Sequence, residues 1–244
     1  ILVISTGATL NGTISADYTA AATTTNAGTA NLTVGTGGLS VDLSLAGGSS
    51  GFNIIGSSGT DTITATGNAD TFTISSSGQG NSDVLDGGAG ADILQVSSGS
   101  HVFASDLNFS NIETVLTDAS GSSINLSAQT EGFTITGGAG IDTLTGGAGV
   151  NVITGDAGND IITGGASDDI ITGGAGDDEL TGGAGADTFN IDAGIDTITD
   201  MSATDILVIS TGATLNGTIS ADYTAAATTT NAGTANLTVG TGGL

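Results

Sequence analysis

Residues 155–181 read GDAGNDIIT, GGASDDIIT and GGAGDDELT, three nine-residue blocks that follow one another without a gap. Each block has small residues in most of its first four places, Asp in the sixth, an aliphatic residue in the eighth and Thr in the ninth. The last three places favour a short strand, because apolar and polar side chains alternate there. The first six places favour a turn, because Gly and Asp are common in turns and tolerate positive φ. Each block therefore predicts a turn followed by a strand.

The same period extends in both directions, so that eight consecutive blocks fill residues 137–208. The sixth place is Asp in seven of these blocks and Asn151 in the other, and the eighth place is always apolar. Two blocks bring the chain back over itself after 18 residues. The sequence thus predicts an all-β fold, a parallel β-roll (a β-helix or solenoid) with two strands per coil, whose apolar strip is buried by stacking. The eighth side chain should point inward, and the seventh and ninth outward.

A less regular run of the same blocks occupies residues 47–104. Four additional residues interrupt its phase, which resumes at Gly78. The sixth places of this run are Phe52, Asp61, Asp70, Asp83, Asp92 and His101. We interpret the run as a degenerate β-roll, and His101 as a lost metal position rather than a catalytic base.

A much longer repeat is also present, since residues 1–39 recur unchanged as residues 206–244. The period is 205 residues, which indicates one full unit and the start of the next in a tandem array; an artificially duplicated segment is the alternative. Residues 1–46 are rich in Thr and Ala and predict β structure, in which Asn11-Gly12 is either a hairpin turn or a bend between coils. Residues 105–136 resemble a spacer between the two runs of blocks.

The composition excludes several classes of function. The chain has 25 acidic residues, no Lys and no Arg, and a formal net charge of −25. No side chain can therefore neutralise nucleic-acid phosphates or an anionic membrane surface, and no long apolar run predicts insertion into a membrane. Cysteine is absent, and the single His has no partners for nucleophilic catalysis. Carboxylates that recur with every coil are unlike a single catalytic pair, so we expect no enzyme activity.

The aspartates require a partner that the polypeptide does not supply. Sixth-place residues two blocks apart should stack at the strand spacing of about 4.8 Å, where bare carboxylates repel one another. A hard divalent cation between them reverses the sign of this interaction. Ca²⁺ accepts six to eight oxygen ligands in flexible geometry, whereas Mg²⁺ requires a tighter octahedron and Zn²⁺ prefers nitrogen or sulfur. Ca²⁺, bound at multiple sites, is therefore the expected cofactor.

Blocks such as GGAGIDTLT and GGAGADTFN resemble the GGxGxDxUx repeats of the RTX (repeats-in-toxin) proteins. In that family, Asp side chains and turn carbonyls bind Ca²⁺ between coils. In the regular run, the resemblance implies as side-chain ligands Asp142, Asp160, Asp169, Asp178, Asp187, Asp196 and Asp205, with a weaker site at Asn151. The implied carbonyl ligands are those of Gly137, Gly155, Gly164, Gly173 and Gly182. In the degenerate run, the candidates are Asp61, Asp70, Asp83 and Asp92.

The resemblance also implies that the chain folds outside the cell, where Ca²⁺ is abundant. Together with the 205-residue repeat, it predicts a secreted, Ca²⁺-dependent structural unit of a long fibre or adhesin stalk at the cell surface. Its expected partners are neighbouring identical repeats. Two alternatives remain open: a surface-layer lattice protein, and the Ca²⁺-binding portion of a secreted enzyme or toxin.

Overall fold

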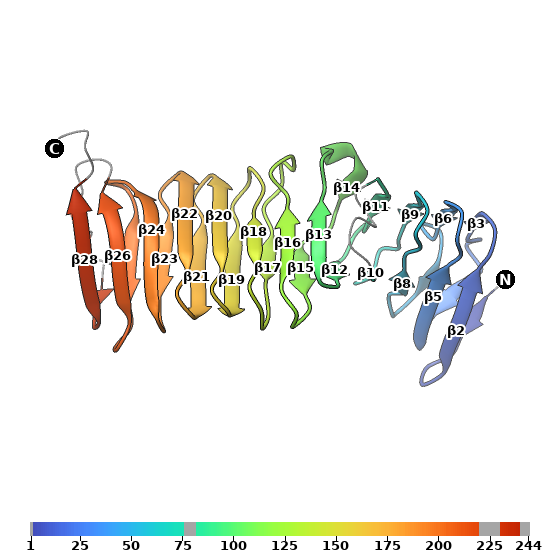
Figure 1. Cartoon of the computed structure of the whole chain (residues 1–244). Coiled ribbons are helices and arrows are strands. Elements are labelled where there is room, and N and C mark those ends of the chain that lie inside the picture. The colour runs from blue at the N-terminus through green and yellow to red at the C-terminus, as the bar shows by residue number, and fades with distance from the viewer. Residues whose placement is uncertain (1, 76–81, 220–229, 240–244) are drawn as a thin grey trace. The chain divides into compact units, whose positions relative to one another are not determined.

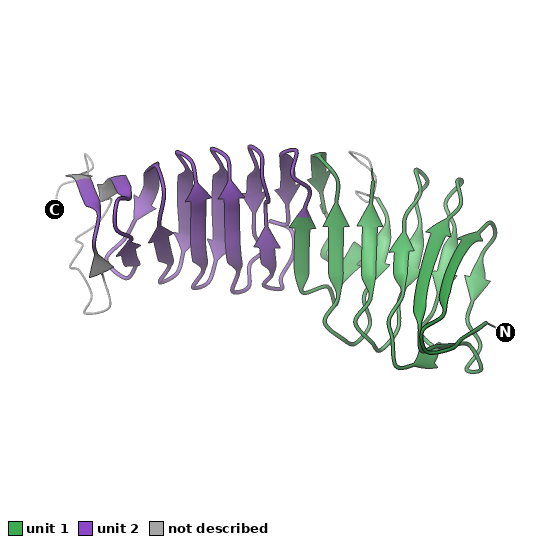
Figure 2. Ribbon diagram, turned by 90° about the horizontal axis from the view of Figure 1, so that it is seen from below, with its two compact units in different colours: residues 1–116 green, residues 117–244 purple. Residues whose placement is uncertain are grey.

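The computed structural model describes residues 2–75, 82–219 and 230–239 (Figure 1). The candidate site residues all lie within these ranges, whereas Gly78, at which the degenerate run regains its phase, lies outside them. The chain divides into two compact units, unit 1 (Ile1–Leu116) and unit 2 (Thr117–Leu244) (Figure 2). Each unit is a stack of short parallel strands, which confirms the predicted all-β parallel β-roll.

The strands of unit 1, the last of which ends at the start of unit 2, are β1 (Val3–Ile4), β2 (Thr9–Ile14), β3 (Tyr18–Thr19), β4 (Thr25–Asn26), β5 (Thr29–Val34), β6 (Ser40–Asp42), β7 (Gly47–Gly48), β8 (Asn53–Ile55), β9 (Thr62–Thr64), β10 (Thr71–Ile74), β11 (Val84–Asp86), β12 (Ile93–Val96), β13 (Gly99–Val102), β14 (Phe109–Ser110) and β15 (Thr114–Thr117). The strands of unit 2 are β16 (Ser122–Asn125), β17 (Thr134–Thr136), β18 (Thr143–Thr145), β19 (Val152–Ala157), β20 (Ile161–Ala166), β21 (Ile170–Ala175), β22 (Glu179–Ala184), β23 (Thr188–Ile191), β24 (Ile195–Met201), β25 (Ile206–Ile209), β26 (Thr214–Ile219), β27 (Thr230–Asn231) and β28 (Thr234–Val239). The helical structure among the described residues is one 3₁₀ turn, η1 (Asp106–Asn108), and no helix there is long and apolar enough to cross a membrane.

Two parallel sheets make up unit 2, one from each strand of the coil. One runs in the order β17-β19-β21-β23-β25-β27 and the other in the order β16-β18-β20-β22-β24-β26-β28. In the regular blocks the register pairs residues that are 18 apart, as in Val152 with Ile170 and Ile161 with Glu179. The predicted coil of two blocks is therefore confirmed here. The strands β19 to β22 are longer than predicted, because each continues through the first three places of the following block.

Unit 1 has wider coils and a third line of strands. Its sheets run in the orders β1-β4-β7, β2-β5-β8-β10-β12 and β3-β6-β9-β11-β14. The register pairs Thr62 with Val84 and Thr71 with Ile93, a separation of 22 residues. The wider coil does not depend on the four additional residues alone, because Val3 with Thr25 and Ser40 with Thr62 also pair at a separation of 22 residues before that interruption. Asn11 and Gly12 lie inside β2, so the expectation of a hairpin turn or a bend at these residues was wrong.

The core of each unit is a narrow apolar column along its coils, mostly aliphatic with a few buried Phe side chains. In unit 2 the eighth-place side chains are at most 4% exposed, which confirms that they point inward. Most seventh-place side chains are exposed, as Ile161 and Ile170 illustrate at 46% and 41%, whereas Thr188 and Ile206 are half-buried. The first-place glycines from Gly137 to Gly182 are buried as well, so the inward positions of a block are the first, the sixth and the eighth. The sixth-place residues are thus held inside the coil, next to the glycine turn.

Candidate metal sites

Unit 2 stacks the sixth-place residues in two columns, one beside each sheet. Asp142, Asp160, Asp178 and Asp196 form the first column, and Asn151, Asp169, Asp187 and Asp205 form the second. None of these side chains is more than 4% exposed. A column of buried acidic residues without any cation in the chain is unfavourable unless each carboxylate finds other partners.

One oxygen of each carboxylate has such a partner in the preceding coil. The backbone N–H of a sixth-place residue donates to Oδ1 of the Asp 18 residues later. The pairs in the first column are Asp142 N with Asp160 Oδ1 (2.8 Å), Asp160 N with Asp178 Oδ1 (2.8 Å) and Asp178 N with Asp196 Oδ1 (3.1 Å). Those in the second column are Asn151 N with Asp169 Oδ1 (2.7 Å), Asp169 N with Asp187 Oδ1 (2.8 Å) and Asp187 N with Asp205 Oδ1 (3.0 Å). We call this series the Oδ1 ladder; it ties each coil to the next.

The other oxygen is left without a donor. Among the described residues, the Oδ2 atoms that are buried and accept no hydrogen bond are those of Asp92, Asp142, Asp160, Asp169, Asp178 and Asp196. The surroundings of these atoms are rich in oxygen: a Cβ built on Gly137 would lie 2.8 Å from Asp142 Oδ2 and 2.7 Å from the carbonyl oxygen of Gly155 in the next coil. Cβ atoms at Gly155, Gly164, Gly173 and Gly182 would likewise collide with the Oδ2 of their own blocks. The first-place glycine therefore leaves a small oxygen-lined cradle beside each Oδ2.

The burial of the carboxylates raises their pKa values. Desolvation is the main cause, and neighbouring carboxylates add to it. The pKa of Asp196 is raised to about 7 and those of Asp187 and Asp92 to about 6. The pKa values of Asp142, Asp160, Asp169 and Asp178 are also raised. A positive ion in the cradle would oppose these shifts, because it favours the ionised form of each carboxylate.

In the degenerate run, two carboxylates accept hydrogen bonds from residues of their own blocks. Asp61 Oδ2 accepts from the backbone N–H and the hydroxyl of Ser57, and Asp70 Oδ2 accepts in the same way from Thr66. Ser57 and Thr66 stand in the second place of their blocks, where the regular blocks mostly have Gly. The structure therefore supplies hydroxyl donors to two of the predicted metal positions of this run.

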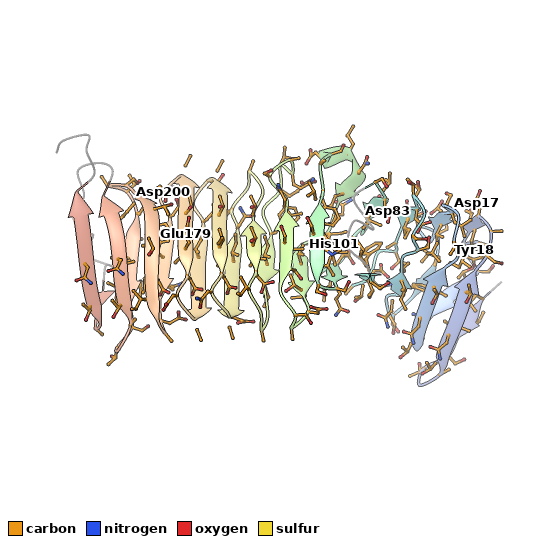
Figure 3. The ribbon with its side chains drawn as sticks, in the orientation of Figure 1. Asp17, Tyr18, Asp83, His101, Glu179 and Asp200 are labelled. Atoms are coloured by element: carbon orange, nitrogen blue, oxygen red, sulfur yellow. The ribbon has the colours of Figure 1, made fainter. Side chains whose placement is uncertain are left out.

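The remaining predicted positions differ among themselves. Asp92 keeps a free Oδ2 like the regular blocks. Asp83, labelled in Figure 3, accepts the backbone N–H of Asp61 at Oδ1 and so belongs to a ladder of its own. At the end of the regular run, Asp205 Oδ2 accepts the backbone N–H of Ser202, and Ile191 replaces the first-place glycine in the block of Asp196.

Sequence reasoning missed several acidic residues that take part in the stacking. Glu113 accepts the backbone N–H of Asp92 at 2.7 Å and continues that ladder into the segment interpreted as a spacer. Asp200, labelled in Figure 3, accepts the backbone N–H groups of Gly182 and Gly183. A shorter ladder joins fifth-place residues, because Asp177 donates its backbone N–H to Asn159. Acidic residues in the fifth place of successive blocks were a visible signal for this ladder, whereas Glu113 stands outside every block.

The oxygen-rich cradles fit a hard cation. In the described part of the chain, no three His, Cys, Asp or Glu side chains come together to hold a metal ion. A site must therefore combine one or two carboxylates with backbone carbonyls, which is the ligand type that Ca²⁺ accepts. The unpaired Oδ2 atoms, the carbonyl oxygens of the next coil and the room left by the glycines meet this requirement.

Comparison with known protein families agrees with this chemistry. The model of the RTX calcium-binding nonapeptide repeat matches the chain four times, at residues 48–73, 77–100, 136–169 and 163–198. A search of curated proteins found no match. Repeats of this family bind Ca²⁺ in successive turns, form a structural β-roll and occur in secreted proteins. Both runs of blocks in this chain are therefore RTX calcium-binding nonapeptide repeats.

Proposed function

We propose that the chain is a Ca²⁺-dependent structural unit of a long tandem array, which forms a fibre or an adhesin stalk outside the cell. The observation that carries this proposal is the unchanged repetition of residues 1–39 as residues 206–244. A Ca²⁺-binding repeat region accounts for the β-roll, and the 205-residue period accounts for its use in series. Neighbouring copies of the same unit are then the partners of each unit.

The start of the second copy supports this arrangement. β26 repeats the sequence of β2 and pairs in parallel with β24. In this second copy Ala213 and Leu215 are 1% and 0% exposed, whereas the identical Ala8 is exposed and Leu10 is only half-buried. The start of the second 205-residue repeat therefore continues the coils of the first repeat and buries apolar side chains against them, which is the packing that a tandem array requires.

Within each unit, we propose that Ca²⁺ ions bind beside the free Oδ2 atoms. The first-place carbonyls complete each site, and the side-chain ligands are Asp92, Asp142, Asp160, Asp169, Asp178 and Asp196. An ion that binds only the folded chain stabilises it by about 2.7 kcal/mol per site at 100 times the Kd. Several sites in one stack therefore make folding steep in Ca²⁺ concentration. The absence of Lys and Arg also removes every trypsin cleavage site, which suits an exposed fibre.

The first experiment is circular dichroism of the full chain during titration with Ca²⁺, with Mg²⁺ as the control. We expect little β signal in EDTA and a cooperative gain with Ca²⁺ but not with Mg²⁺ at the same concentration. Full β structure in EDTA would contradict folding that depends on the ion. Negative-stain microscopy of native material then tests the array: filaments support it, whereas a flat lattice or free monomers favour a surface layer or a secreted enzyme.

The ligand assignment has a matched pair of variants in one coil. Asp178 and Glu179 are adjacent, but Asp178 is buried in the first column. Glu179, labelled in Figure 3, is an exposed seventh-place residue. Asp178→Ala should lose about one bound Ca²⁺ per molecule and raise the Ca²⁺ midpoint of folding. Glu179→Ala removes the same charge and should change neither. Equal ion counts in Asp178→Ala and the unaltered chain would show that the ligand assignment is wrong.

A further inference from the structure

Asn151 is the one residue in the regular columns that cannot carry a negative charge. Its amide nitrogen Nδ2 lies close to four oxygen atoms: Gly149 O at 2.7 Å, Asp169 Oδ1 at 3.0 Å, and Gly147 O and Gly164 O at 3.2 Å each. Three of these oxygens are backbone carbonyls, and they come from two successive coils. A cage of oxygens around one point is the environment of a bound cation, and here an amide NH₂ group occupies it.

The orientation of the amide is fixed by its neighbours. Asn151 Oδ1 faces donors, since it accepts the backbone N–H of Phe133 at 3.0 Å and that of Gly147 at 3.3 Å. The opposite end of the amide faces only acceptors. Exchanging the nitrogen and the oxygen would place oxygen against four oxygens and N–H against N–H, so the NH₂ group belongs in the cage.

The first-place carbonyl of this cage recurs in the aspartate blocks, but there it has no side-chain donor beside it. The carbonyls that Asn151 contacts are those of the second and fourth places of its own block and the first place of the next coil. In the block of Asp160, Gly173 O is the first-place carbonyl of the next coil, and a Cβ on Gly155 would collide with both this oxygen and Asp160 Oδ2. The Oδ2 atom of Asp160 accepts no hydrogen bond among the described residues. The N–H groups that the amide of Asn151 donates to these oxygens thus have no counterpart at Asp160.

His101 gives an independent instance in unit 1. It stands in the sixth place of a degenerate block, and its Nε2 lies 3.0 Å from the carbonyl oxygen of Ser97 (Figure 3 labels His101). Ser97 is the second-place residue of that block, which corresponds to Gly147 in the block of Asn151. Because a carbonyl only accepts, Nε2 carries the proton. At both positions a side-chain N–H group donates to the second-place carbonyl of its own block.

We propose that the side-chain amide of Asn151 replaces a calcium ion, so that the coil it closes holds no metal at this position. The inference rests on the proposed function, in which sixth-place aspartates are Ca²⁺ ligands. It makes the sixth residue the determinant of ion occupancy in each block: Asp recruits an ion into the cage, and Asn fills the cage with its own N–H groups. The number of ions bound by each 205-residue repeat therefore depends on how many of its blocks have Asp in the sixth place.

The test is the number of Ca²⁺ ions bound per molecule at saturation, measured by equilibrium dialysis of the full chain with metal analysis. Asn151→Asp should add one ion, and Asp160→Asn should remove one while the β signal in circular dichroism is kept. Asn159→Asp is the matched control, because it makes the same change in the exposed fifth place and should add none. Asn151→Ala should leave the ion count unchanged and lower the thermal stability of the Ca²⁺-loaded chain.

The outcomes separate this inference from the proposed function. If Asp160→Asn and Asp178→Ala both keep the full number of ions, the ligand role of the aspartates fails. If those variants each lose one ion but Asn151→Asp gains none, the aspartates are ligands and the replacement at Asn151 is wrong. Failure of Asn151→Asp to fold in saturating Ca²⁺ would also overturn it, since the added ion is expected to close that coil.

Discussion

The sixth-place aspartates from Asp142 to Asp178 use their two carboxylate oxygens for different purposes. Oδ1 accepts the backbone N–H of the preceding coil and so fixes the stacking of the turns. Oδ2 faces the cradle left by the first-place glycine and has no donor in the blocks of Asp142 and Asp160. The sequence pattern identified the residue but could not separate these two tasks, because both depend on the coil that stacks against it.

Adding one methyl group to the cradle should disturb a site directly. Gly173 is buried, and a Cβ there would collide with Asp178 Oδ2. Gly173→Ala should therefore lower the free energy of unfolding of the Ca²⁺-loaded chain by about 1–3 kcal/mol and weaken Ca²⁺ binding. Gly67→Ala is the control, because nothing lies within 4 Å of a Cβ at that exposed glycine. Equal denaturation curves for the two variants would contradict the cradle.

The raised pKa values predict how the Ca²⁺-free fold responds to acid. Because the pKa of Asp196 is raised to about 7 and those of Asp187 and Asp92 to about 6, the folded chain binds protons more tightly than the unfolded chain. Stability in EDTA should then be greatest below the ordinary carboxyl pKa near 4 and fall as pH rises through about 6 to 7. In EDTA the β signal in circular dichroism should therefore be larger at pH 5 than at pH 8. In saturating Ca²⁺ the urea midpoint should instead be higher at pH 8 than at pH 5, because protons compete with the ion; a higher midpoint at pH 5 would count against bound metal at these carboxylates.

At the scale of the element, one strand of a block contributes a single side chain to the core. Ile162 is fully buried, whereas the adjacent Ile161 is 46% exposed. Ile162→Ala should cost about 2–5 kcal/mol of unfolding free energy in saturating Ca²⁺, and Ile161→Ala about 1 kcal/mol or less. Chemical denaturation of the two variants measures the difference. Similar costs would mean that the eighth place is not the core position of the block.

The period of the regular blocks could be converted into strands because it repeats without interruption. It predicted the 18-residue coil and the burial of the eighth place, and both are present in unit 2. It did not predict that β19 to β22 continue into the following turn, since that extension depends on pairing with the neighbouring coil. Asn11-Gly12 carries a turn signal but lies within β2, because the neighbouring strand β5 pairs along its whole length. Glu113 was missed because its place in a ladder depends on the stacking above Asp92 and not on a motif.

At the scale of the whole molecule, the two runs of blocks should depend on Ca²⁺ to different degrees. Asp61 and Asp70 have hydroxyl donors from Ser57 and Thr66, whereas the buried Oδ2 atoms of the regular run, such as that of Asp160, have no donor. On the proposed assignment, the coils of Asp61 and Asp70 are held by the chain's own hydroxyl groups and the regular coils by Ca²⁺. Such a chain is expected to lose its structure in steps as Ca²⁺ is removed.

Hydrogen exchange of the full chain at decreasing Ca²⁺ concentrations tests this order, because amide protection reports the local opening of each coil. Peptides from residues 155–181 should lose protection at a higher Ca²⁺ concentration than peptides from residues 62–74. Thr66→Val removes the hydroxyl that donates to Asp70 Oδ2 at 2.7 Å. In this variant, residues 62–74 should lose amide protection at a higher Ca²⁺ concentration than in the unaltered chain. The regular blocks should respond as before, since Thr66 contributes nothing to their cradles. Loss of protection in both segments at one Ca²⁺ concentration would mean that every coil depends on the ion alike, and that the hydroxyl donors of unit 1 do not replace it.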